Sequence, residues 1–90
     1  MKIEKFGETY FIKDDTKDYI LSGDLIKTVQ GNFIINICTY TKDDTHIATM
    51  TGEYRPEENV IHYDFRTKIT EYDQQVEIVP LVISTIKSLV

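Results

Sequence analysis

Apolar residues near the end of the chain recur at alternating steps of four and three, which is the spacing of one face of an α-helix. Beside this line runs a second one through Ile78, Val82 and Leu89, with Thr85 as its one polar member. Because so little of the surface is polar, this helix must be covered on most sides, and the residues before it are expected to form the sheet on which it lies. The first line consists of Tyr72, Val76, Val79, Ile83, Ile86 and Val90.

Pro80 interrupts this pattern, because a proline inside a helix cannot donate its hydrogen bond and costs about 3 kcal/mol. One alternative is a helix that restarts at Pro80, with residues 74–79 forming a short additional strand. The four-three spacing continues through the proline, and this favours a single kinked helix. Its start is predicted at Thr70, with Asp73 three residues later as a variant of the capping box.

Two turns in the middle of the chain predict three antiparallel strands that agree with each other. A loop at Asp43-Asp44 pairs residues 33–39 with residues 48–54, and a loop at Pro56–Asn59 pairs residues 48–54 with residues 61–67. Both registers place the same residues on one face, and a slip by one residue would turn that set outward. The pairs are Thr39 with Ala48 and Thr67, Ile37 with Met50 and Phe65, Ile35 with Gly52 and Tyr63, and Phe33 with Tyr54 and Ile61.

The first third of the chain predicts two further strands. Phe6–Lys13 alternates, with Phe6, Tyr10 and Ile12 facing away from Phe11, and the chain then turns at residues 14–18. Residues 19–30 form the next extended stretch, where Gly23-Asp24 indicates a bulge or bend. The sequence therefore predicts a single α+β domain over residues 1–90, an antiparallel β-meander of about five strands with a C-terminal helix packed on one face.

Charge and cysteine content restrict the classes of function. Ten basic against fifteen acidic residues give a net charge of −5, which opposes non-specific binding to nucleic acid or anionic membrane. Cys38 is the only cysteine, so a multi-thiol zinc site and an internal disulfide are not expected. Residues 1–20 show no signal-peptide pattern, and the longest apolar run, Ile78–Ile83, is too short to cross a bilayer. We expect a cytoplasmic protein without a cofactor or metal.

The sheet face opposite the helix is also predicted to carry apolar residues. Curling of the sheet would bury some of them, helped by Phe6 and Tyr10. Alternatively, they form an exposed patch of the kind that marks a homodimer or partner interface. The candidate self-association residues are Leu25, Val29, Ile34, Tyr40 and Ile47.

Alternate turns of a meander lie at the same end of the sheet, and here those turns are rich in aspartate. Turns attract aspartate for local hydrogen bonds, which is one explanation. The other is a docking surface for a basic protein, including a nucleic-acid-handling protein whose phosphate site the carboxylates would occupy. Lysines at 13, 17, 42 and 68 flank these residues. The predicted acidic rim consists of Asp14, Asp15, Asp18, Asp43, Asp44, Glu71 and Asp73.

Catalytic candidates are few. His62 and Asp64 share one strand face and would suit a general base with an orienting carboxylate. The simpler explanation is a charged pair across a solvated sheet, since the register places Glu53 opposite His62. His46 lies near the aspartates of one turn, but no set of three or four metal ligands can be named around it.

Two functional hypotheses follow. The first is a small non-catalytic intracellular binding or regulatory protein, such as an inhibitor or accessory factor, that uses the acidic rim and the apolar sheet face. The second is a small-ligand binder or modest enzyme that uses His62 and Asp64, with a pocket between helix and sheet lined by Tyr54, Tyr63 and Phe65.

Overall fold

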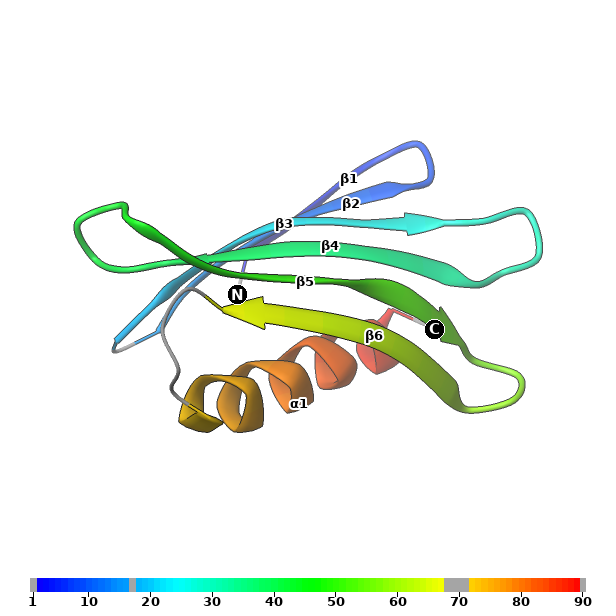
Figure 1. The fold of residues 1–90 in the computed structure, drawn as a ribbon. Coiled ribbons are helices and arrows are strands. Elements are labelled where there is room, and N and C mark those ends of the chain that lie inside the picture. The colour runs from blue at the N-terminus through cyan, green and yellow to red at the C-terminus, as the bar shows by residue number, and fades with distance from the viewer. Residues whose placement is uncertain (1, 17, 68–71, 90) are drawn as a thin grey trace.

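A six-stranded antiparallel sheet and one helix form two layers in the computed structural model (Figure 1). The structure describes residues 2–16, 18–67 and 72–89, with the helix side chains described from Val76 onward. Neighbours in sequence are neighbours in the sheet, so the α+β meander is confirmed, with six strands instead of about five. The elements are β1 (Lys2–Phe6), β2 (Thr9–Asp15), β3 (Ile20–Lys27), β4 (Phe33–Tyr40), β5 (His46–Arg55), β6 (Val60–Thr67) and α1 (Tyr72–Ser88).

The additional strand arises at Gly7. Residues 6–13 were expected to form one strand, but the chain reverses between Phe6 and Thr9, which are paired in neighbouring strands. Gly7 has a φ of 60°, and glycine at the first central position is the signature of a two-residue type II′ hairpin turn. Phe6 therefore belongs to β1 and does not share a strand with Tyr10.

Three of the four remaining hairpins, those that follow β3, β4 and β5, share one turn geometry. Each closes with a backbone N–H that donates to the carbonyl three residues earlier, from Gly31, Asp44 and Asn59. These three residues have positive φ values of 84°, 67° and 52°. Glycine, asparagine and aspartate tolerate this left-handed conformation best, which explains why they occupy the position.

The strand registers predicted for β4, β5 and β6 are confirmed at every pair. We call the helix-covered side of the sheet its inner face and the opposite side its outer face. Phe33, Ile35, Ile37 and Met50 lie on the inner face at no more than 1% exposure. They form one core with Tyr10, Ile12, Leu21, Leu25, Tyr54 and the helix residues Ile78, Val79, Val82 and Ile86.

Gly23 does not produce the expected bulge, because β3 is continuous and pairs residue by residue with β2 and β4. A β-carbon at Gly23 would lie 2.1 Å from the carbonyl oxygen of Asn36, so glycine allows a close approach between strands instead. The irregularity lies between Thr39 and Tyr40, where the pairing shifts opposite Ile47. Because the β3 register is unbroken, Tyr10 and Leu25 lie in line with the inner-face residue Ile35, and neither side chain covers the outer face.

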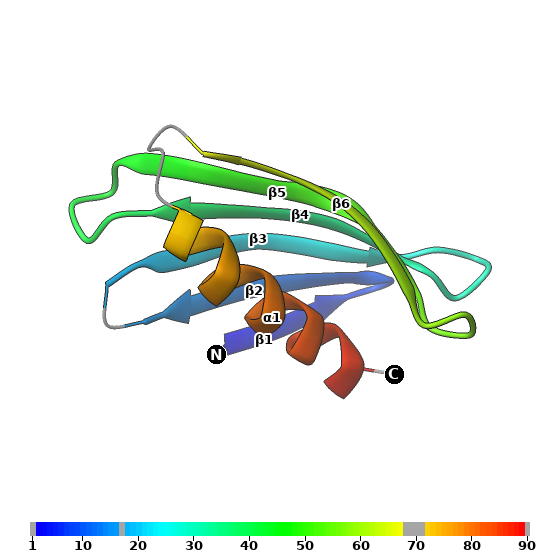
Figure 2. The same ribbon diagram turned by 60° about the horizontal axis from the view of Figure 1, so that its bottom comes forward.

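Helix α1 lies across the inner face (Figure 2) and contains Pro80 within it. The strand alternative for residues 74–79 is therefore wrong. Pro80 is exposed, whereas Ile78 and Val79 before it and Val82 after it are buried against the sheet. Thr70, the predicted cap, lies outside the described residues. Within the described part of the chain, no helix is long and apolar enough to cross a bilayer.

Candidate binding surfaces

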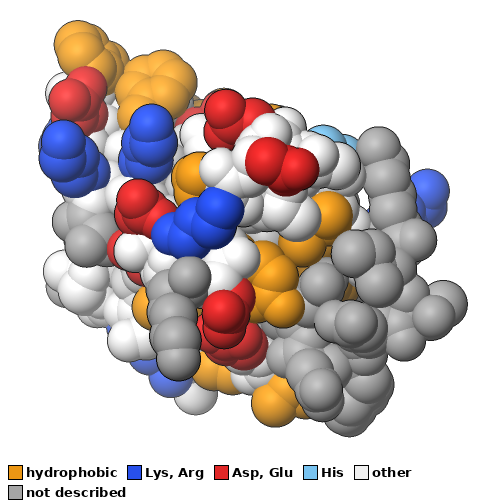
Figure 3. All heavy atoms as spheres, turned by 90° about the vertical axis from the view of Figure 1, so that its left-hand side faces the viewer, with side chains coloured by type: hydrophobic (Ala, Val, Ile, Leu, Met, Phe, Trp, Pro, Cys, Tyr) orange, Lys and Arg blue, Asp and Glu red, His pale blue; other side chains and the backbone are white. Residues whose placement is uncertain are grey.

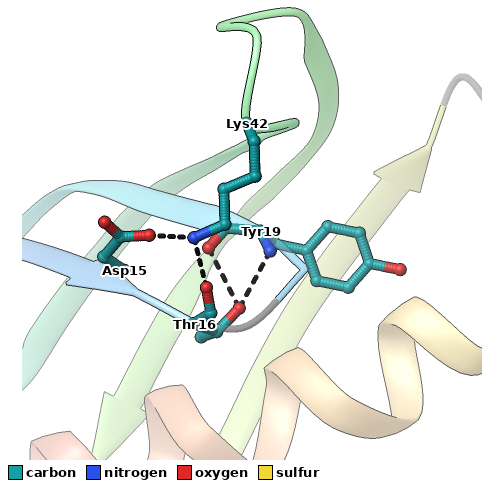
Figure 4. Close-up of polar contacts among 4 residues, drawn as sticks. All are labelled: Asp15, Thr16, Tyr19 and Lys42. Carbon is teal, nitrogen blue, oxygen red and sulfur yellow. Dashed lines mark hydrogen bonds and ion pairs between the residues drawn. The ribbon is translucent and has the colours of Figure 1, made fainter.

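The loop between β2 and β3 and the loop between β4 and β5 lie side by side at one end of the sheet (Figure 1). Lys42 joins them, because its Nζ contacts the carboxylate of Asp15 and donates to the backbone carbonyl of Thr16 (Figure 4). Five of the seven predicted rim aspartates and glutamates are thus brought to this end. Glu71 lies outside the described residues, and so does the side chain of Asp73.

Local hydrogen bonds fix the shape of both loops. The Oγ1 of Thr16 donates to the carbonyl of Tyr19 and accepts the Tyr19 N–H, each at 2.9 Å. In the other loop, the Oγ1 of Thr41 donates to the Asp43 carboxylate and accepts the Thr45 N–H at 3.2 Å. The aspartates are therefore carried by ordered turns.

The rim is a mixed surface of carboxylates and lysines. Figure 3 shows basic side chains lying between acidic ones at this end. Hydrogen bonds from Thr41 and Thr45 hold the pKa of Asp43 below its ordinary value, so this carboxylate stays charged at neutral pH. Lys13 and Lys42 partly balance the five aspartates, and Asp15 is already paired with Lys42. The rim would therefore attract a basic surface through a moderate, salt-sensitive field.

Four large apolar side chains are exposed on the outer face. Phe6 is 63% exposed and Phe11 47%, and their rings meet edge to face with centroids 5.7 Å apart. Ile26 and Ile34 are directly paired in β3 and β4, at 40% and 44% exposure. Exposed apolar groups gathered on one face of a small protein are typical of a contact surface.

Only part of the predicted self-association set belongs to this patch. Ile34 and Tyr40 lie on the outer face as expected, and Val29 is fully exposed in the loop between β3 and β4. Leu25 was placed wrongly, since it pairs with the inner-face residue Ile35 and is completely buried. Ile47 is only 3% exposed because it sits at the irregular pairing opposite Tyr40.

Phe11 and Ile26 were missed as surface residues. Ile26 was missed because a bulge was expected at Gly23, and a bulge would have changed the face on which the residues after it lie. The register is unbroken and places Ile26 beside Ile34. For Phe11 the signal was present, since the alternation with Tyr10 and Ile12 already placed it on the other face.

A small polar cluster lies on the outer face near the rim. The Oγ1 of Thr49 lies 2.7 Å from the Nε2 of His46 and 3.9 Å from the Sγ of Cys38. The His46 ring packs against Tyr40 with centroids 5.5 Å apart. The pKa of the Tyr40 hydroxyl is raised, chiefly because negative charge at Cys38 opposes its ionisation, and secondarily by burial. These contacts hold His46 in place on the sheet surface.

The carboxylates beside His62 are engaged elsewhere. Glu53 does lie opposite His62 in the sheet, as predicted, but its carboxylate accepts a hydrogen bond from Arg55 at 2.6 Å. Asp64 likewise accepts one from Arg66 at 2.7 Å. Both pairs join residues two apart on the same strand and are partly or largely exposed. An orienting carboxylate for His62 is thus not formed by either residue.

The hollows found on the described surface lie on the outer face and beside the loops. The best-formed one has a volume of about 420 Å³ and is lined by residues of β1, β2 and β3, among them Lys13, Ser22 and Asp24. Tyr54, which was expected to line a pocket beneath the helix, is instead packed in the core and donates from its hydroxyl to Asn59 at 3.0 Å. Among the described residues, no group of three or more His, Cys, Asp or Glu side chains converges to hold a metal.

Comparison with protein-family models, with curated proteins and with solved structures gives no match for this chain. The functional argument therefore rests on the two surfaces described above.

Proposed function

We propose that this chain is a small regulatory binding protein that docks on a basic protein partner through its acidic rim. The proposal is supported by the junction made by Lys42, which joins the loop that carries Asp43 and Asp44 to the end of β2 at Asp15 and Thr16. Because the loops are held by their own hydrogen bonds, little ordering cost would be added when a partner binds. Inhibition of a basic, nucleic-acid-handling protein is one role that such a surface would suit.

The charged side chains support binding over catalysis. The two carboxylates nearest to His62 are paired with arginines, and Asp18, Asp43 and Asp44 of the rim lie on exposed turns. Exposed carboxylates on ordered turns would speed encounter with a positive surface and fix the orientation of docking. The lone Cys38 fits a reducing compartment such as the cytoplasm.

The test is affinity capture from a lysate of the source cells with the wild-type chain and a rim variant. The variant carries Asp18→Asn, Asp43→Asn and Asp44→Asn, which remove three rim charges and keep the size of the side chains. We expect the wild type to retain a basic protein that the variant loses. Raising the salt concentration to about 0.5 M should release it, because contacts between exposed charges are screened there.

A matched control removes three carboxylates from turns at the opposite end of the sheet. Glu8→Gln, Glu57→Gln and Glu58→Gln change the net charge by the same amount and leave the rim intact. Capture should survive in this variant. Equal loss in both variants, or a captured partner that ignores both salt and the rim substitutions, would contradict the proposed function.

A further inference from the structure

The outer face carries four rows of side chains that run across the strands, as the pairing registers define them. The first row is apolar on three strands, where it contains Phe6, Ile26 and Ile34. An acidic row follows, with Glu4, Asp24 and Asp64, and then a basic row with Lys2, Lys13 and Arg66. The fourth row contains Ile20, Tyr40 and His46.

This order of rows makes the outer face complementary to the outer face of a second copy of the chain. A two-fold axis that lies in the outer face, runs across the strands and passes between the acidic and basic rows would place each strand over the same strand of a second copy. The acidic row of each copy would then face the basic row of the other. The first row would face the fourth, with Ile26 over Ile20, Ile34 over Tyr40, and Glu53 over His46.

We propose that the outer face is the interface of a symmetric homodimer with this arrangement. Charge complementarity is the reason for choosing a second copy as the occupant. Two-fold symmetry requires a self-complementary surface, and opposite charges that lie in adjacent rows satisfy this requirement. Packing of two sheets face to face at a separation of about 10 Å would bring the long side chain of Lys13 within reach of Asp24 in the other copy.

The shape of the face also fits. Phe11 projects from β2 within the acidic row, between Glu4 and Asp24, and lines the hollow of about 420 Å³ that lies over Ser22 and Gly23. These two residues are small, and this leaves the space open. The axis would place Phe11 of each copy over Lys13 of the other, and Lys13 lines the hollow, so each ring would lie at the edge of the partner's hollow. Each contact would occur twice in the dimer.

The available area is sufficient for a stable contact. The Cα atoms span 36 × 24 × 16 Å, so the broad face of the molecule is about as large as the ~800 Å² that each partner buries in a standard interface. Asp14 and Asp15 end strand β2, whereas Asp18, Asp43 and Asp44 of the rim lie on loops beyond the ends of the strands. These three loop aspartates of each copy would therefore remain accessible at opposite ends of the dimer, and the dimer does not depend on the proposed function of the rim.

The test is sedimentation velocity of the full chain over a concentration series from micromolar to millimolar. We expect the wild type to sediment with twice the chain mass of 10.5 kDa. Lys13→Glu and Asp24→Lys should each weaken the dimer by about tenfold or more, because each substitution brings like charges together across the axis. Mixing the two variants should restore association, since the mixed dimer pairs opposite charges at both sites.

Lys27→Glu is the matched control, because Lys27 is exposed and pairs with the inner-face residue Phe33. It should leave the dimer unchanged, and circular dichroism of all variants checks that they fold. A wild type that stays monomeric throughout the series would overturn the proposal. So would a dimer that neither single substitution weakens, or two weakened variants that do not recover when mixed. None of these outcomes depends on a rim partner.

Discussion

Gly52 and Tyr63 lie in neighbouring strands at a distance that leaves no room for a side chain on the glycine. A β-carbon at Gly52 would lie 2.8 Å from the Cα of Tyr63 and 2.2 Å from the carbonyl oxygen of His62. Both neighbours are backbone atoms, so a rotation of a side chain cannot relieve the clash. Glycine is therefore required here for the approach of β5 to β6.

Gly52→Ala is expected to lower the free energy of unfolding by about 1–3 kcal/mol, because the two strands must separate to admit the methyl group. Chemical denaturation monitored by circular dichroism measures the change. Thr51→Ala, at the exposed neighbouring position, should stay within about 0.5 kcal/mol of the wild type. An equally stable Gly52→Ala variant would show that this approach of the strands is not required.

The pair Gly52 and Tyr63 shows which part of the fold could be predicted from local sequence patterns. The pairing of Gly52 with Tyr63 followed from the loop at Pro56–Asn59, and the loop at Asp43-Asp44 independently placed the same residues on one face. Asp44 and Asn59 adopt the left-handed conformation that these turns use. For Gly7 and Gly23 the sequence was ambiguous, because glycine serves turns, bulges and close approaches alike. Misreading both glycines removed one strand from the prediction and placed Leu25 on the wrong face.

The candidate surfaces were predicted less completely than the fold. Ile34 and Tyr40 followed from the β4 register, whereas Ile26 depended on a β3 register that the sequence left open. The pairing of Lys42 with Asp15 joins two loops that are 26 residues or more apart. Contacts of this kind depend on loop shape, which composition and periodicity do not define.

Pro80→Ala is expected to stabilise the protein by about 1–3 kcal/mol. The substitution restores the N–H that would bond to the carbonyl of Val76, and proline inside a helix costs about 3 kcal/mol. Because Pro80 is exposed, the change should not disturb the core. Thermal and chemical unfolding provide the measurement, with the exposed Ser84→Ala as control. A less stable variant would mean that packing against the sheet requires the distortion that proline introduces.

Lys42→Met is expected to loosen the junction of the two rim loops and leave global stability almost unchanged. The ion pair with Asp15 is largely exposed, and exposed pairs contribute between about 0 and 1 kcal/mol. Amide hydrogen exchange should become faster at Thr16 and Tyr19, since the carbonyl of Thr16 loses a donor. Unchanged exchange in this loop would show that Lys42 does not order it.

Asp43 should make stability dependent on acid pH. Its pKa is lowered in the folded state by hydrogen bonds from Thr41 and Thr45. The contribution of Asp43 to the free energy of unfolding is therefore complete at pH values above its ordinary pKa of about 3.9. This contribution is lost as the pH falls through the lower pKa of the folded state. Relative to Asp43→Asn, the wild type should therefore lose stability on acidification. Unfolding curves measured from neutral pH downward test this, and parallel pH profiles would contradict it.

The claim that most needs testing is that the outer face, and not the helix side, is the contact surface of the molecule. Hydroxyl-radical footprinting of the wild type across a dilution series measures this for individual side chains. With rising concentration we predict protection of Phe11, Ile34 and Tyr40, while the exposed Tyr63 and Val76 on the other side are labelled equally throughout. Protection of Val76 with no change at Phe11 and Ile34 would contradict the account.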